Sequence, residues 1–155
     1  MLVAQNLLLE TIVSGAPLDD VLGAMATVIE VRDQSARCCI FLPDPDGSTL
    51  RLKVAPKLPE SFAHSLKSLP IGPLAGTCGA AAYRRERVIV SDVTVDPLYK
   101  HSNEPVRMHR LRSCWATPIV SQEGVLLGVI AIYRKRPHVP GRGDPLPVLL
   151  PGASP

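Results

Sequence analysis

Two apolar segments joined by a short polar turn constrain the fold of this chain more than any other feature. Residues 113–120 read SCWATPIV and residues 125–133 read VLLGVIAIY, with SQEG between them. β-Branched residues dominate both segments, which favours strands over helices. A turn of this length joins neighbouring antiparallel strands. We therefore predict a β-hairpin, and with it a β-sheet.

A second hairpin is predicted nearer the N-terminus. The apolar segment RCCIFL (37–42) is followed by PDPDGST (43–49), whose proline, aspartate and glycine residues are typical of a turn. In LRLKVA (50–55) apolar and basic residues alternate, as in a strand with one buried face.

One helix is predicted before these strands. In APLDDVLGAMATVIEVR (16–32) the apolar residues recur at helical spacing. Pro17 suits the first helical position, and Asp19 and Asp20 complement the positive end of the helix dipole. Residues 2–13 suit a further helix, and their surplus of apolar positions suggests that another subunit covers them.

The middle of the chain mixes short elements. We expect a short helix near 59–69, a small-residue helix beginning near Cys78, a brief strand at 88–90 and a loop with some helix at 92–111. After Arg136 the composition changes, because six prolines preclude a regular helix or a central strand: Pro137, Pro140, Pro145, Pro147, Pro151 and Pro155. Residues 137–155 are predicted to be a Pro/Gly-rich tail or linker. The whole is an α+β domain.

Composition excludes several classes of protein. A chain of 155 residues has the size of one domain. Its net charge of +3, from 17 basic and 14 acidic residues, is too mild to indicate a nucleic-acid partner. The longest apolar stretch falls well short of the roughly 20 residues of a membrane span, and the N-terminus lacks signal-peptide features. We expect a cytoplasmic protein with reduced thiols and no membrane partner.

Two longer segments resemble a known family. CGAAAYRRERVIVSDVTVDPLY (78–99) and LRSCWATPIVSQEGVLLGVIAIYRKRP (111–137) are similar to GAF domains, the small-molecule sensor modules of bacterial signalling proteins. The similarity is greatest to GAF domains that precede cyclic-di-GMP enzymes or histidine kinases. It runs from about Leu7 to Arg136, so we expect a GAF domain at 1–136.

The resemblance implies both a fold and a function. The expected fold is a central antiparallel sheet flanked by helices on both faces, with a ligand cavity under the helix near Cys78 and the loop 92–110. The expected function is non-catalytic sensing of an unidentified small molecule. Ordering of the loop around that ligand would shift the N-terminal helices, through which the chain is expected to form a homodimer. Output would pass to an effector domain or a partner protein, and no cofactor is specified.

Six residues are expected to contact the ligand: Cys78, Asp92, Tyr99, Met108, Trp115 and Thr117. Strand alternation sends Cys114 to one face, and Trp115 and Thr117 to the other. Trp115 offers a stacking surface for an aromatic ligand, although core packing explains it equally well. The alternatives are loop capping for Asp92, and a surface position for Tyr99.

Cys78 has three interpretations. Thr77 is expected to cap the helix, whose positive end would lower the thiol pKa and favour a nucleophile. However, three following alanines let the helix lie close to the sheet, and cysteine is often buried. We rank core packing first, pocket lining second and thiol chemistry last.

The chemical alternative is a thiol-dependent reductase of free methionine sulfoxide. GTCG (76–79) resembles a motif of the GAF-fold enzymes with that activity, but those enzymes place further cysteines in the loop after the short strand, where this chain has none. A metal set of His101, His109 and Cys114 matches no recognised zinc spacing. The basic residues after the alanines are expected to be solvated: Arg84, Arg85 and Arg87.

Overall fold

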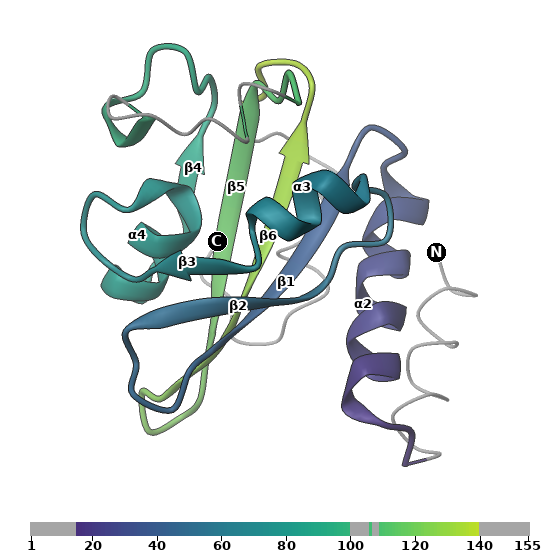
Figure 1. Cartoon of the computed structure of the whole chain (residues 1–155), viewed down its shortest axis with the longest axis vertical. Helices are drawn as coiled ribbons and strands as arrows, with labels where there is room; N and C mark the ends of the chain where they lie inside the picture. Colours follow the sequence, from purple (N-terminus) through teal and green to yellow (C-terminus); the bar gives the residue numbers. More distant parts are fainter. Residues whose placement is uncertain (1–14, 100–105, 107–108, 140–155) are drawn as a thin grey trace.

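The computed structural model describes residues 15–99, 106 and 109–139. In this part of the chain six antiparallel strands form one sheet in the order β3-β2-β1-β6-β5-β4 (Figure 1). The strands are β1 Arg37–Pro43, β2 Thr49–Val54, β3 Ser68–Pro70, β4 Val88–Val90, β5 Ser113–Val120 and β6 Leu126–Arg134. The helices are α2 Leu18–Arg32, α3 Glu60–Ser65, α4 Gly76–Arg84 and the 3-10 turn η1 Pro97–Tyr99.

Both predicted hairpins are confirmed. β1 pairs with β2, and β5 pairs with β6. The two hairpins are joined through their central strands, because β1 also pairs with β6, with Phe41 opposite Val129. The expected brief strand at 88–90 is β4, which adds to the outer side of β5.

The prediction of a short helix at 59–69 is wrong for the second half of this range. α3 ends at Ser65, and residues 68–70 form the edge strand β3, with Leu69 opposite Leu50. Three residues are too few to display a strand period. Their conformation depends on pairing with β2, which the local sequence pattern does not predict.

The sheet separates two apolar cores. Cys38, Ile40, Ile130 and Ile132 point to the face covered by α2. Alternate residues of the same strands point to the other face, where α3, α4 and the segment after β4 cover them: Cys39, Phe41, Val129, Ala131 and Tyr133. The adjacent residues Cys38 and Cys39 thus face opposite cores, as strand alternation requires. The expected sheet with helices on both faces is confirmed.

α2 forms where predicted, except that Pro17 lies one position before the first helical position expected for it. It begins at Leu18, and Pro17 occupies the cap position, where its carbonyl accepts bonds from the amides of Asp20 and Val21. The helix predicted at 2–13 lies outside the described residues. None of the described helices is long and apolar enough to cross a membrane.

The end of α2 is tied to the sheet by buried charge. The guanidinium of Arg134, which is fully buried, donates to Asp33 Oδ2 over 2.7 Å. The buried Glu30 accepts a bond from the amide of Cys38 over 3.0 Å. Burial raises the pKa of Asp33, but hydrogen bonds from Ser35 and Arg134 outweigh it and lower that pKa to about 2. The ionised carboxylate is therefore stabilised in the folded state.

α4 lies unusually close to its neighbours. A side chain on Gly79 would overlap the carbonyl oxygen of Pro70 and would lie 2.7 Å from Ala75 Cβ. Gly76, at the start of the helix, has a φ of 73°, which glycine adopts without strain. The run Ala80–Ala82 is buried against the sheet. The glycines of this motif are therefore explained by packing and backbone geometry.

Replacing Asp33 by Asn is expected to destabilise the protein by about 2 kcal/mol, because it removes the charge that Arg134 binds. Urea unfolding at neutral pH measures this loss. Since the folded pKa lies below the unfolded value of 3.8, the stabilisation is present above pH 4 and disappears as the pH falls toward 2. Asp19→Asn, at an exposed site, is the control and should cost under about 0.5 kcal/mol; equal losses would contradict the assignment.

The same substitution in two helices should have opposite effects. Gly79→Ala forces Pro70 or Ala75 to move and should destabilise by roughly 1–3 kcal/mol. Gly23→Ala, in α2, meets no atom within 4 Å and should stabilise by about 0.5–1 kcal/mol through helix propensity. Thermal unfolding of both variants checks the pair, and a stabilising Gly79→Ala would show that α4 is packed less closely.

Candidate functional site

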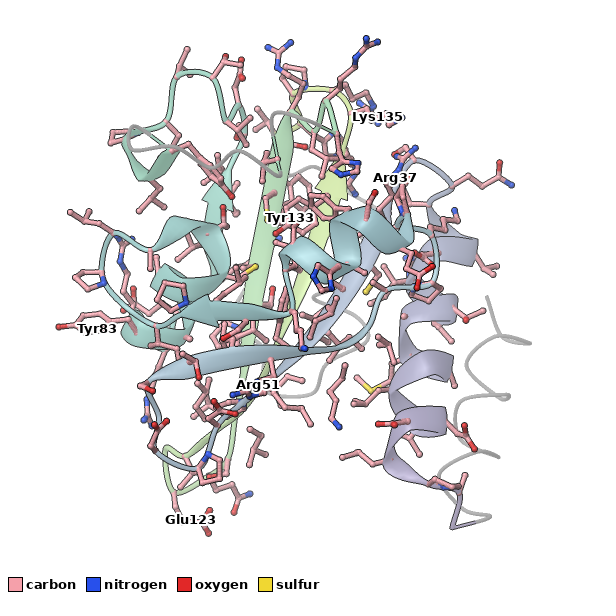
Figure 2. All side chains as sticks on the ribbon, in the orientation of Figure 1. Arg37, Arg51, Tyr83, Glu123, Tyr133 and Lys135 are labelled. Carbon is pink, nitrogen blue, oxygen red and sulfur yellow. The ribbon has the colours of Figure 1, made fainter. Side chains whose placement is uncertain are left out.

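A buried cluster of hydroxyls and thiols lies between α4 and the sheet. Cys78 Sγ is 3.7 Å from Tyr133 Oη, and Thr77 Oγ1 is 2.6 Å from Tyr99 Oη. Cys114, on β5, completes the cluster, since its thiol is the first of the groups that lower the pKa of Cys78. Tyr133, labelled in Figure 2, packs edge-on against Phe62 of α3, with the ring centroids 5.7 Å apart. The cluster thus joins α4, the sheet and the segment after β4.

Thr77 does not cap α4, contrary to the prediction. The helix begins at Gly76 with no side-chain cap. Thr77 points inward, where its hydroxyl is hydrogen-bonded to the hydroxyl of Tyr99. Tyr99 is buried, so the expectation of a surface tyrosine is also excluded. The contact replaces a local cap with a tertiary tether between α4 and η1.

The thiols are free but not exposed. Cys78 is 3% exposed and Cys114 fully buried, and both are reduced. Hydrogen bonding from Cys114, and then from Tyr133, lowers the pKa of Cys78, while burial raises the pKa of Cys114 well above its usual range. Burial likewise raises the pKa of Tyr99 and Tyr133. Cys78 therefore fits the core-packing interpretation that we ranked first.

Asp92, just after β4, binds Arg112, just before β5, and so joins the two ends of the segment between these strands. Its Oδ1 accepts bonds from the amide and hydroxyl of Thr94, and Arg112 donates to Oδ2 over 3.0 Å. The hydrogen bond from Arg112, then those from Thr94, lower the pKa of Asp92 to about 2. The loop-capping interpretation of Asp92 is confirmed. Its carboxylate already accepts hydrogen bonds from Thr94 and Arg112.

Trp115 lies on the other face of the sheet from Cys78, so the expectation that both line one cavity is wrong. Its ring stacks on His138 at 4.7 Å, the Arg134 guanidinium lies 4.5 Å from the ring centroid, and its indole N–H donates to the carbonyl of His138. Thr117 is buried on the same face. The physical reason is strand alternation: Cys114 lies on the face that α4 covers, so Trp115 lies on the opposite face of the sheet.

The prediction that Arg87 is solvated is also wrong. Arg84 and Arg85 are exposed as expected, whereas Arg87 is half-buried, with its guanidinium 5.9 Å from the Trp115 ring. Packing around Trp115 continues beyond the expected boundary at residue 136, as far as His138, whose amide donates to the carbonyl of Ser91.

The remaining candidates do not form a site. Met108 and His101 lie outside the described residues. His109 packs edge-on against Phe62 at 4.8 Å. Within the described ranges, no group of three His, Cys, Asp or Glu side chains is placed to hold a metal ion.

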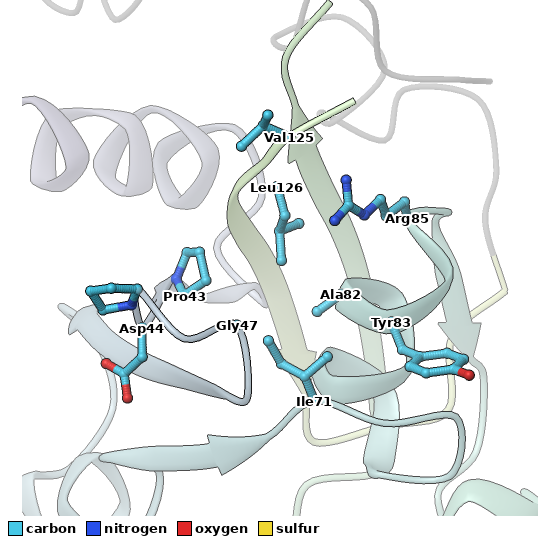
Figure 3. A pocket seen from close by; sticks show the side chains of 10 residues that line it. Pro43, Asp44, Gly47, Ile71, Ala82, Tyr83, Arg85, Val125 and Leu126 are labelled. Carbon is cyan, nitrogen blue, oxygen red and sulfur yellow. The ribbon is translucent and has the colours of Figure 1, made fainter. Parts of the chain in front are cut away.

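Two hollows lie elsewhere on the described surface. One, of about 410 Å³, opens between the β1–β2 turn, the end of α4 and the start of β6, where Tyr83, Arg85 and Leu126 surround it (Figure 3). The other, of about 350 Å³, lies where β4 and β6 end and β5 begins. It is lined by Val93, Thr94, Arg110, Leu111, Arg112 and Lys135. Neither is lined by Cys78 or Trp115.

Sequence reasoning missed the residues of this second hollow. Arg110 and Lys135 carry no motif, and only the antiparallel order of β4, β5 and β6 brings their chain segments to one end of the sheet. It also missed Tyr133, the centre of the buried cluster. The available signal was strand alternation, which places Tyr133 on the same face as Ala131.

Comparison with known proteins gives the family. A model of the GAF domain matches residues 18–144. The chain is 32% identical over 140 residues to the methyl sulfide methyltransferase-associated sensor of Methanosarcina acetivorans, a match that covers 90% of this chain and 14% of the relative. It therefore corresponds to a small part of that protein's length.

Solved structures agree on the fold. The GAF domain of a phosphoenolpyruvate-protein phosphotransferase from Coxiella burnetii superposes with a TM-score of 0.73 at 21% identity, over 92% of this chain and 82% of that one. A free methionine-R-sulfoxide reductase from Neisseria meningitidis, in complex with its substrate, gives 0.66 at 21% identity, over 84% and 71%. At such identities the likeness concerns the fold alone. Because the family model matches most of this chain, the chain belongs to the GAF domain family.

Proposed function

We propose that this chain is a non-catalytic sensing domain that binds a small molecule beside the segment running from Asp92 to Arg112. One observation carries the proposal: this segment is fixed at its base and tethered at η1, so a ligand beside it would act on the sheet and on α4 together. The base is the pair Asp92–Arg112, and the tether is the bond between Tyr99 and Thr77. The curated relative is named as a sensor, which supports this assignment.

The geometry also offers a route toward α2. The amide of Arg112 donates to the carbonyl of Arg134 over 2.8 Å, and the side chain of Arg134 binds Asp33 just after α2 ends. A change at the end of the sheet thus reaches α2 through two hydrogen-bonded steps. In this proposal, ligand binding shifts α2 relative to the sheet, which is the kind of packed, two-state displacement used in signalling domains.

The wider signalling context is part of the proposal. We infer a cytoplasmic homodimer that contacts through its N-terminal helices and passes its signal to an effector such as a cyclic-di-GMP enzyme or a histidine kinase. The similarity of the chain to a sensor supports a signalling role. Sedimentation of the whole chain as a monomer at high concentration would contradict the dimer.

The second candidate is a methionine sulfoxide reductase. It is favoured by one observation, that the thiols of Cys78 and Cys114 lie close enough to shift each other's pKa although their positions in the sequence did not suggest a pair. Reduction of a sulfoxide consumes two thiols and yields a sulfide, a disulfide and water. Against it, both sulfurs are buried, and neither hollow described above reaches them.

The sensing proposal predicts that a ligand stabilises the domain. In thermal melts with cyclic nucleotides, purines, haem and small anions, one class should raise the midpoint by several degrees at a hundredfold excess over its Kd. Hydrogen exchange should then slow at residues 93–99 and near the end of α2. If no compound shifts the midpoint, the sensing role is lost.

A matched pair of variants sharpens this test. Tyr99→Phe removes the hydroxyl that binds Thr77 and should reduce the ligand-induced slowing of exchange in α4. Tyr83→Phe, at a side chain that is 58% exposed, should leave it unchanged. Equal behaviour of the two variants would show that the tether does not transmit binding.

The reductase alternative is tested by activity. We expect reduction of free methionine sulfoxide at background level in both the native chain and Cys78→Ser, with dithiothreitol as reductant, because both thiols are buried. Native turnover that Cys78→Ser abolishes would establish the reductase instead.

A further inference from the structure

The hollow of about 350 Å³ is formed by three segments that meet at one end of the sheet. The amide of Val93, after β4, donates to the carbonyl of Arg112, and the amide of Arg112, before β5, donates to the carbonyl of Arg134, at the end of β6. These bonds, each 2.8 Å long, hold the three backbones side by side. The hollow is therefore built on the rigid sheet rather than on a single loop.

The walls of the hollow are cationic. Arg110, Arg112 and Lys135 line it, and the carboxylate that binds one of them is Asp92, paired with Arg112. Among the described residues, neither Arg110 nor Lys135 has an ion pair or a side-chain hydrogen bond. Counted over the described residues alone, three cations against one carboxylate leave an excess of two positive charges around a concave surface, which attracts anions.

The backbone of Arg110 adds a second indication. Its φ of 57° is in the left-handed region, where residues other than glycine are uncommon. A strained residue that lines a hollow is a frequent mark of a binding site. Here the strained position holds an arginine with no described partner.

The floor of the hollow is apolar. Val93 and Leu111 are 4% and 2% exposed and belong to the core on the α4 side of the sheet. Arg112 directly precedes β5 and Lys135 directly follows β6, so continued alternation places both on the same face as this core. A volume of about 350 Å³ is within the range of sites for small molecules, roughly 300–1,000 Å³.

We propose that this hollow binds a small organic anion, with its carboxylate or phosphate among Arg110, Arg112 and Lys135 and its apolar body on Val93 and Leu111. Arginine forms paired hydrogen bonds with either oxyanion, so the shared chemistry is a compact, planar or tetrahedral group of oxygens. This inference rests on the proposed function, because it names the class of ligand that the segment from Asp92 to Arg112 would sense.

The experiment uses calorimetric titration of the whole chain with benzoate, phenyl phosphate and benzamide at constant ionic strength. Benzoate and benzamide have the same ring and nearly the same shape, so their difference reports the anionic charge. At least one of the two anions should bind at least tenfold more tightly than benzamide. Which of them binds more tightly distinguishes carboxylate from phosphate.

Two double variants of equal charge test the location. Arg110→Ala with Lys135→Ala should weaken binding of the preferred anion at least tenfold. Lys67→Ala with Arg84→Ala removes two exposed cations that do not line the hollow and should change binding less than twofold. Circular dichroism confirms that both variants are folded.

Three results would overturn the inference: no saturable binding of either anion, equal binding of benzamide, or equal loss in the two double variants. If one of these occurs while a neutral compound still stabilises the domain in the thermal melts, the sensing role stands and only the anionic class of ligand is wrong. If no compound of any class binds, both fail together.

Discussion

Burial of the central strands on both faces is the constraint on which this structure depends. β1, β5 and β6 lie between two apolar cores, so neighbouring residues of one strand belong to different environments. Cys114 joins the buried cluster under α4, while Trp115 packs with Arg134 and His138 on the face of α2. The sheet therefore separates the two cores. A structural change on one face is transmitted to the other through the strands rather than through direct contact between side chains.

Hydrogen-bonded polar groups, of which Arg134 is fully buried, connect the two sides at one end of the sheet. Asp33 binds Arg134 on the α2 side, Arg134 is bonded through its carbonyl to Arg112, and Arg112 binds Asp92 on the other side. Hydrogen bonds from Ser35 and Arg134 outweigh burial at Asp33, and those from Arg112 and Thr94 act at Asp92, so the pKa of each aspartate is lowered to about 2 and both stay ionised across the neutral range. The proposed anion site lies beside this connection, which gives a sensing domain a physical link from ligand to helix.

Local sequence was a good guide where a pattern repeats over many residues and a poor one where it does not. The two hairpins and α2 followed from alternation, turn residues and helical spacing. β3 was missed because three residues show no period and only the pairing of Leu69 with Leu50 fixes them. Thr77 was misassigned because a helix cap and a tertiary bond to Tyr99 both suit a threonine at that position. The family resemblance supplied the overall architecture.

The sequence by itself determined the two hairpins, α2, the α+β class, the opposite orientation of adjacent strand residues and the dense packing of the small-residue helix. Each of these depends on period, turn chemistry or side-chain size within a short window. Tertiary structure alone decided that Trp115 and Cys78 are separated by the sheet, and that Arg110, Arg112 and Lys135 share one hollow. Those results depend on strand order and on which face each helix covers, and contacts between residues far apart in the chain leave no local pattern to detect.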